Sequence, residues 1–298
     1  MMQQQNKLHQ EVKWLVENEV PSVLDHIHKL ITQCLKSSTS SKSSKFHLTC
    51  TTSTCGNETI RGSLILHQDT LCGMEIFMKP TKTISTVKAS FRSDKQWKLQ
   101  QIQDAVNHMK AIKQLVDNIL TEQECIDHCA EGIVCVLDDV IKELIRCQAR
   151  LATPCQLSLN SLIGSGFAKM FSPPLPGDTL VNLYVLENRL VLNYYTVQQA
   201  HTNASLSPSK NGKLHQRNLA GRSLVHHAGA MFEHAGIRYE MATSSSAECI
   251  VPTLTNLLDT ASYVQTICQN LKDKVIERLP RALYLFNNVN VYFFSLQC

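Results

Sequence analysis

Apolar residues recur at steps of three and four along residues 93–120, the spacing that keeps one stripe of an α-helix facing a core. Ser93 opens this segment, and its hydroxyl together with the Gln96 side chain can form a capping box. No Gly or Pro interrupts the run. The pattern therefore predicts one long helix over 93–120, whose apolar stripe must be covered by other segments.

Three further segments carry a helical period. Residues 6–36 contain one, in which Pro21 should kink or restart the helix because proline lacks an amide proton. Residues 124–151 follow the central helix after a short break, which favours an antiparallel pair. In residues 250–275 the steps alternate between four and three, as in a coiled-coil or bundle seam. The expected seam residues are Leu99, Ile102, Val106, Met109, Leu254, Leu257, Val264 and Leu271.

The period changes in two β-rich stretches. Residues 46–91 contain short runs of β-branched and aromatic residues that predict three or four strands. The runs LVNLYVL and RLVLNYYTV flank Glu187-Asn188, which predicts a hairpin in which Asn188 tolerates positive φ. RSLVHHAGAMFEH and IRYEMAT add strands, whereas the polar residues 198–222 predict a disordered loop.

The order α, β, α, α, β, α predicts an α+β protein with an antiparallel four-helix bundle and a separate antiparallel β-sheet domain, both discontinuous in sequence. The helical domain should comprise 1–36, 93–152 and 250–278. The β domain should comprise 46–92 and 153–249, after a flexible polar linker at 37–45. Residues 279–298 form an atypical tail outside both domains.

Composition narrows the function classes. The chain has 298 residues and a formal charge of +4 without a dense Lys/Arg stripe, so a nucleic-acid groove is not supported. Its first residues are polar and no apolar run reaches about eighteen residues, which favours a cytosolic or nuclear protein with no membrane span. The twelve cysteines are scattered through helical patterns, so we expect reduced and mostly buried thiols.

No motif predicts catalysis, a cofactor or a metal. Cys125 and Cys129 lie one helical turn apart, but Cys129 belongs to an apolar stripe, which favours a core thiol over a zinc ligand. His226, His227 and His234 have no carboxylate or cysteine at a convincing spacing. We therefore expect no catalytic residue, no cofactor and no metal site.

Trp97 is the unusual residue of the predicted central helix. The pattern places it in the first turn of that helix, beside Lys95, Lys98 and Gln101. One interpretation packs the indole against the neighbouring β domain. The other makes it an aromatic anchor for a partner protein, since tryptophan is enriched at interface hot spots. On the second interpretation, the partner-binding residues are Trp97, Lys95, Lys98 and Gln101.

Several motifs of the sequence closely resemble the signature of the Rogdi family, whose members are also labelled leucine-zipper proteins. The resemblance is carried first by the motif FRxDKQWKLQQIQDA at 91–105, where x is any residue, and it covers roughly residues 8–276 in the same order. Shorter motifs that also match are RLxTP, where x is any residue, MF, LVN, GAMFE, ECIVP and LKDK. Residues 279–298 do not resemble the family's ending, which an alternative splice form or a faulty gene model would explain.

The resemblance implies a helical-bundle α domain, a separate β domain and a non-enzymatic role. The family looks like the metazoan counterpart of the small subunit of the yeast RAVE complex, which reassembles the V-ATPase proton pump. The implied partners are WD-repeat rabconnectin-like scaffold proteins and peripheral V-ATPase subunits. The implied location is the cytoplasm, with recruitment through partners to endosomal or synaptic-vesicle membranes, or the nucleus.

A second hypothesis is a dimeric zipper-type nuclear regulatory protein, which the heptads of 250–275 and the mild positive charge suggest. A DNA-binding zipper needs a basic region ahead of its heptads. The residues before this seam, TSSSAECIVP, contain no basic side chain. The adaptor hypothesis is therefore preferred.

Overall fold

The computed structural model of the chain describes residues 10–11, 13–51, 60–79, 86–121, 130–155, 157–200 and 229–278. These residues form helices and one antiparallel sheet, which confirms the predicted α+β class. Most of the predicted loop at 198–222, the start of the predicted helix at 124 and the whole tail at 279–298 lie outside the described residues. The chain divides into two compact units, of which one includes Asp104–Arg150 and the other Ser40–Gln103 and Leu151–Thr255.

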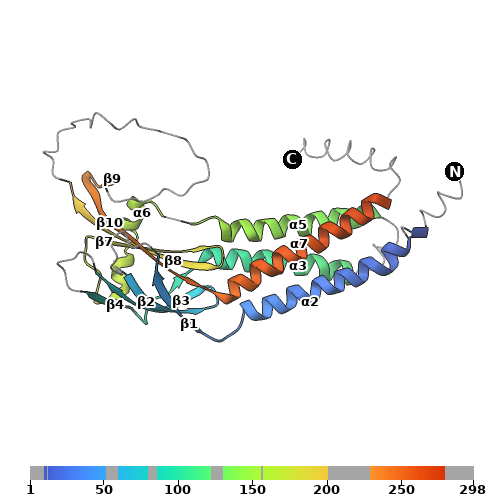
Figure 1. Ribbon diagram of the computed structural model, residues 1–298, viewed down its shortest axis with the longest axis horizontal. Helices are drawn as coiled ribbons and strands as arrows, with labels where there is room; N and C mark the ends of the chain where they lie inside the picture. The colour runs from blue at the N-terminus through green and yellow to red at the C-terminus, as the bar shows by residue number, and fades with distance from the viewer. Residues whose placement is uncertain are drawn as a thin grey trace, which may run out of the picture. The chain divides into compact units, whose positions relative to one another are not determined.

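The first unit is built from helices that lie side by side (Figure 1), and the described residues up to Thr39 and from Asn256 to Arg278 complete it. Each helix turns an apolar stripe inward. The helical segments are a π-helical turn, η1 (Leu15–Glu19), followed by α2 (Val20–Ser38), α3 (Gln100–Thr121), α5 (Ala130–Ala152) and α7 (Pro252–Arg278). The finer prediction, an antiparallel four-helix bundle with the stated domain boundaries, stays a prediction.

Pro21 changes the geometry of the first helix as predicted. It is the second residue of α2, and the π-helical turn Leu15–Glu19 comes immediately before that helix. The missing proline amide removes one α-helical hydrogen bond, and a wider turn accommodates this loss.

Polar contacts tie neighbouring helices of the first unit together. Arg150 Nε donates to Asp104 Oδ2 at 2.7 Å, which joins α5 to α3. Asn256 Nδ2 donates to Ser37 Oγ at 3.0 Å, which joins α7 to α2. His28 Nε2 lies 2.9 Å from Asp117 Oδ1, between α2 and α3. These pairs connect the four helices at defined positions, each with the modest energy of a partly exposed polar contact.

The central helix begins later than the sequence predicts, so the predicted capping box at Ser93 is wrong. Helix α3 starts at Gln100, and Trp97 stands in a two-residue strand rather than in a first helical turn. Trp97 pairs with Leu71, and Leu99 N donates to Asp69 O at 2.8 Å. Pairing with residues 69–71, in a turn and the strand that follows it, thus replaces the local helical hydrogen bonds over these residues.

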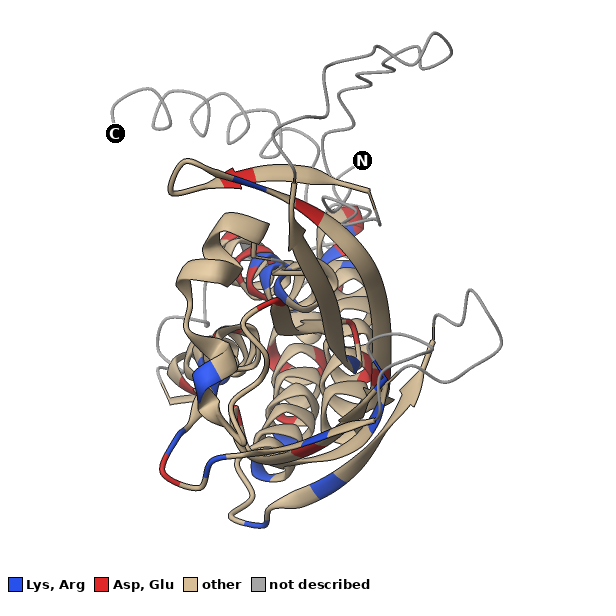
Figure 2. Ribbon diagram, turned by 90° about the vertical axis from the view of Figure 1, so that its left-hand side faces the viewer, with Lys and Arg blue, Asp and Glu red and all other residues tan. Residues whose placement is uncertain are grey.

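The second unit contains one ten-stranded antiparallel sheet in the order β6-β4-β3-β2-β1-β10-β8-β7 (Figure 1). Strand β5 pairs with β3, and β9 pairs with β10. The strands are β1 (Ser44–Cys50), β2 (Ile60–His67), β3 (Thr70–Met78), β4 (Val87–Phe91), β5 (Trp97–Lys98), β6 (Phe171–Ser172), β7 (Thr179–Leu186), β8 (Arg189–Gln199), β9 (Met231–His234) and β10 (Ile237–Ile250). Viewed from its end, the sheet curls (Figure 2).

The two β-rich stretches of the sequence meet in this sheet. Strands β1 and β10 are antiparallel neighbours, with Thr49 opposite Glu248 and Cys50 opposite Ala247. The prediction that both stretches build one sheet is therefore confirmed. Two short helices, α6 (Leu159–Gly164) and the 3-10 helix η2 (Phe167–Met170), complete the unit.

A compact hydrophobic cluster lies between α6 and the sheet. Leu159 and Leu162 pack with residues of three strands: Leu180, Tyr195, Val197 and Met241. Strand β7 is buried on both faces, apart from its last residue. Such a strand cannot show the alternation of a half-exposed strand, which explains the continuous apolar runs of the sequence.

The predicted hairpin of β7 and β8 is present, but the residue with positive φ is Glu187, at 56°, rather than Asn188. Asn188 instead forms hydrogen bonds with residues at the start of α7. Its backbone oxygen accepts from Val251 N at 2.9 Å, and its side-chain nitrogen donates to Thr255 Oγ1 at 3.1 Å. Glu187 N donates to Leu151 O at 2.8 Å. The hairpin turn therefore satisfies backbone groups at two helix ends.

Candidate functional site

Trp97 is buried within the second unit. Only 8% of its surface is exposed, and its ring stacks on Phe167 of η2 with centroids 3.9 Å apart and an interplanar angle of 20°. This arrangement corresponds to the packing interpretation of Trp97. The signal in the sequence is the alternation Trp97, Lys98, Leu99, which places two large apolar side chains on one side of a short strand.

The charged side chains around Trp97 are exposed and form ion pairs with their neighbours. Arg92 binds Asp94 with two hydrogen bonds, Nε to Oδ1 at 2.9 Å and Nη2 to Oδ2 at 2.7 Å. The hydrogen bond from Arg92 lowers the pKa of the Asp94 carboxyl, and the same bond raises the pKa of Arg92. Lys95 Nζ lies 3.8 Å from Asp94 Oδ2, and Lys98 Nζ lies 3.7 Å from Asp69 Oδ2. Of the predicted partner-binding residues, Lys95 and Lys98 are those that face solvent.

Gln101 is 4% exposed and forms hydrogen bonds inside the second unit. Its Oε1 accepts from Val185 N at 3.0 Å, and its Nε2 donates to Val185 O at 3.1 Å. The same Nε2 donates to Thr153 O at 2.9 Å. Gln101 therefore stabilises the fold, and in this conformation it offers no polar atom to a partner.

The seam residues lie where their helices meet other elements. Leu99, Ile102, Met109, Leu254, Leu257, Val264 and Leu271 are all buried. Val106 is only half-buried, whereas Ala105 beside it is fully buried. The small Ala105 lets α5 approach α3, since Cys147 Sγ lies 3.5 Å from Ala105 O.

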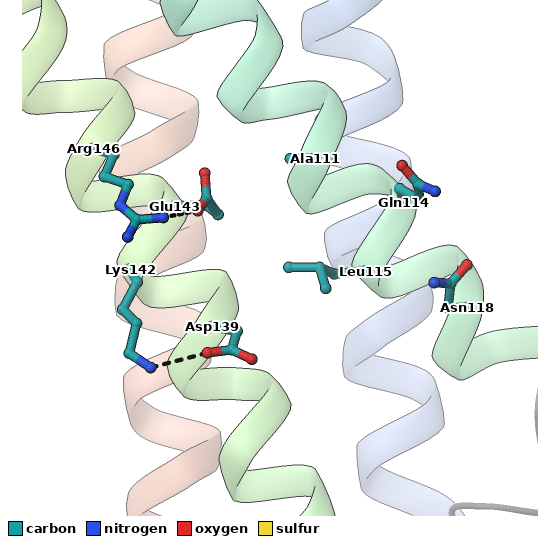
Figure 3. Close-up of a pocket in the computed structure, with 8 residues that line it drawn as sticks. All are labelled: Ala111, Gln114, Leu115, Asn118, Asp139, Lys142, Glu143 and Arg146. Carbon is teal, nitrogen blue, oxygen red and sulfur yellow. Dashed lines mark hydrogen bonds and ion pairs between the residues drawn. The ribbon is translucent and has the colours of Figure 1, made fainter. Parts of the chain in front are cut away.

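A groove of about 520 Å³ runs between α3 and α5 in the first unit (Figure 3). Arg146 binds Glu143, and Lys142 Nζ donates to Asp139 Oδ1 at 2.9 Å. His108 Nδ1 also lies 2.7 Å from Glu143 Oε2. Partial burial opposes ionisation of Glu143, but hydrogen bonds from His108 and Arg146 hold the pKa of its carboxyl below the ordinary value. Each cation in the groove is matched by an anion, so the groove attracts no charged ligand strongly.

A second groove of the first unit, of about 570 Å³, contains an exposed aromatic residue that no sequence pattern singled out. Trp14 is 60% exposed and lines this groove together with Glu19 and Arg278. Lys274 of α7 forms an ion pair with Glu19, which lines the groove. In the sequence, Trp14 lies outside the apolar stripe of its helical segment. A position outside the stripe indicates an exposed side chain.

The described residues offer no evident catalytic chemistry. Among them, no group of three or more His, Cys, Asp or Glu side chains is placed to hold a metal ion. Burial raises the pKa of Cys147 and of Cys268 to about 12, which keeps both thiols protonated and poorly nucleophilic. In the same part of the chain, no helix is long and apolar enough to cross a membrane.

Comparison with known proteins identifies relatives along nearly the whole chain. Residues 11–276 match the family described as "Rogdi leucine zipper containing protein". The chain is 34% identical over 276 residues to the Protein rogdi homolog of Danio rerio, covering 90% of this chain and 92% of the relative. It is 33% identical over 276 residues to the homolog of Homo sapiens, covering 90% and 91%. Protein rogdi of Drosophila melanogaster is 24% identical over 273 residues, covering 89% and 86%. These names state no enzymatic activity.

Proposed function

Because the chain belongs to the Rogdi family, we propose that it is a non-enzymatic adaptor subunit of a RAVE-like complex that regulates assembly of the V-ATPase proton pump. The observation that carries this proposal is the family match over residues 11–276, which includes residues of both compact units. The partners are WD-repeat rabconnectin-like scaffold proteins and peripheral V-ATPase subunits. Through them, the protein acts on acidification of endosomes and synaptic vesicles from the cytoplasm.

An adaptor works by holding two partners at a high effective concentration, which needs stable surfaces rather than a reactive centre. The ion pairs between α2, α3, α5 and α7 support such surfaces, and we propose that these helices form a rigid four-helix bundle. The exposed ring of Trp14 supplies an aromatic anchor of the kind enriched at interfaces. Lys95 and Lys98 supply a charged rim, which affects the association rate more than the affinity.

The alternative function, a dimeric zipper-type nuclear regulator, is less well supported because the seam of α7 is buried. Val264, Cys268 and Leu271 of the α7 heptads are at most 2% exposed within a single chain. A dimeric zipper needs these positions free for a second copy. Their burial means that α7 would have to leave its neighbours before it could form a zipper.

The test is a pull-down of the tagged full chain from cells of its source organism, with quantitative mass spectrometry of the associated proteins. We expect WD-repeat rabconnectin-like proteins and peripheral V-ATPase subunits to be enriched over a tag-only control. Recovery of the chain alone, or with chromatin proteins, would contradict the proposal.

Two matched variants locate the contact. Trp14→Ala removes the exposed indole, whereas Tyr263→Ala removes an aromatic ring that is 54% exposed on α7. We expect Trp14→Ala to reduce partner recovery at least fivefold and Tyr263→Ala to change it less than twofold. Equal recovery with both variants would exclude the Trp14 groove as the contact.

A further inference from the structure

Strands β1 to β4 present one face that the second unit leaves open. In β2, for example, Ile60 and Leu64 are buried. The residues that directly follow them, Arg61 and Ile65, are exposed. The neighbouring strands follow the same alternation. The side chains that define the open face are Lys45, His47, Arg61, Ile65, Phe77 and Lys88.

Phe77 stands at the centre of this face with a cation on either side. In the sheet register, Arg61 of β2 and Lys88 of β4 are both direct partners of Phe77 on β3. Arg61 Cζ lies 5.7 Å from the centroid of the Phe77 ring, and Lys88 Nζ lies 5.4 Å from it. The ring faces attract both cations, so the three side chains form a fixed row across three strands.

The face carries an excess of positive charge. Among the residues that the structure describes in β1 to β4, the anion on this face is Glu75, whose Oε1 lies 3.3 Å from Lys88 Nζ. Three cations, Lys45, Arg61 and Lys88, against this one carboxylate leave an excess of two positive charges, before any contribution from His47. Lys45 and Arg61 form no ion pair with any residue that the structure describes.

The spacing of the cations selects the kind of partner. Strands are about 4.8 Å apart, so Arg61 and Lys88 are separated by ~10 Å across the sheet. Lys45 lies opposite Ile65, four residues along β2 from Arg61, which adds ~13 Å along the strand at about 3.3 Å per residue. One phosphate cannot contact cations so widely spaced. One aromatic ring also gives no stacking platform for successive bases of a nucleic acid.

We propose that the face formed by β1 to β4 binds an acidic segment of a partner polypeptide. Carboxylates of that segment pair with Arg61, Lys88 and Lys45, and an apolar side chain between them contacts Phe77 and Ile65. The charge and geometry of this face are sufficient for such binding. This binding goes beyond the adaptor role and does not require the partner to belong to a V-ATPase assembly complex.

The test uses the purified full chain and a fluorescein-labelled ten-residue glutamate peptide with one central phenylalanine, measured by fluorescence anisotropy at low salt. Arg61→Gln combined with Lys88→Gln should weaken binding at least tenfold. The matched control is Lys36→Gln combined with Lys110→Gln, which removes the same charge from exposed positions of α2 and α3. We expect less than a twofold change for the control. Equal weakening by both pairs would show attraction by net charge alone and would overturn the proposal.

Two further measurements test the apolar contact and the class of partner. Phe77→Leu keeps every charge, so a loss of about threefold supports the apolar contact and an unchanged affinity contradicts it. Phosphatidylserine vesicles and an oligothymidylate are titrated with the same variants. If the Arg61 and Lys88 substitutions abolish binding to either of these but leave peptide binding intact, the acidic polypeptide is the wrong partner. No V-ATPase component is present, so this test can fail while the adaptor role stands.

Discussion

Gln101 caps the edge strand β7 at Val185 with the two hydrogen bonds that a neighbouring strand would form. Val185 N donates to Gln101 Oε1 at 3.0 Å, and Val185 O accepts from Gln101 Nε2 at 3.1 Å. Strand β7 ends the sheet order, so among the described residues no strand lies beyond it to pair these groups. A side-chain amide has the same donor and acceptor as a peptide group, which allows one residue to protect a buried edge.

Substitution of Gln101 should therefore destabilise the protein although it removes little apolar contact. Gln101→Leu leaves the buried N–H and C=O of Val185 unpaired, and we expect a loss of about 2–3 kcal/mol in the free energy of unfolding. Urea denaturation followed by circular dichroism measures this loss. Gln103→Leu, the same change on a half-buried position two residues along, serves as the control and should change the free energy by less than ~0.5 kcal/mol. Equal effects would refute the capping role.

The heptad seam of α7 should stabilise the single chain. Leu257 is 1% exposed, whereas the adjacent Leu258 is only half-buried. Leu257→Ala should cost about 3 kcal/mol because it leaves a cavity, and Leu258→Ala less than about 1 kcal/mol. Chemical denaturation at several protein concentrations checks both values. A cost that grows with protein concentration would instead indicate that the seam joins two copies.

The stack of Trp97 on Phe167 should appear as an energetic coupling. A double-mutant cycle with Trp97→Leu and Phe167→Leu removes each ring separately and then both. We expect a coupling energy of about 0.5–1.5 kcal/mol, the usual contribution of an aromatic pair beyond its buried area. Additive effects would mean that the two rings fill space independently.

Glu143 should make stability depend on pH in acid. The pKa of its carboxyl lies below the ordinary value of 4.5 in the folded state, so ionised Glu143 stabilises the fold above pH 4.5. This contribution is lost as the pH falls through the folded-state pKa. Glu143→Gln should therefore cost up to about 1 kcal/mol at pH 7 and progressively less below pH 4.5. Denaturation at pH 7, 5, 4 and 3 measures the difference, and a cost that persists at pH 3 would contradict this assignment.

The helices and strands could be predicted where one local period dominates. Helix α7 begins at Pro252, because proline has a φ suited to the first helical turn and lacks the N–H that would find no acceptor there. Trp97 and Gln101 show where this reasoning fails. The residues before Gln100 fit a helical period, but pairing with β3 satisfies their backbone more fully than a free helix end would. No local pattern contains the position of Leu71, which stands in β3, or of Asp69, which stands in the turn before that strand.

The sequence by itself determined the family, the α+β class and most of the buried stripes, because periodicity depends only on neighbouring residues. The tertiary structure decided which polar side chains are buried and which aromatic rings are exposed. Gln101 lies inside and Trp14 outside, although both stand in helical segments. The physical reason is that burial depends on what packs against a residue. For Gln101 that partner is Val185, which follows 84 residues later in the chain.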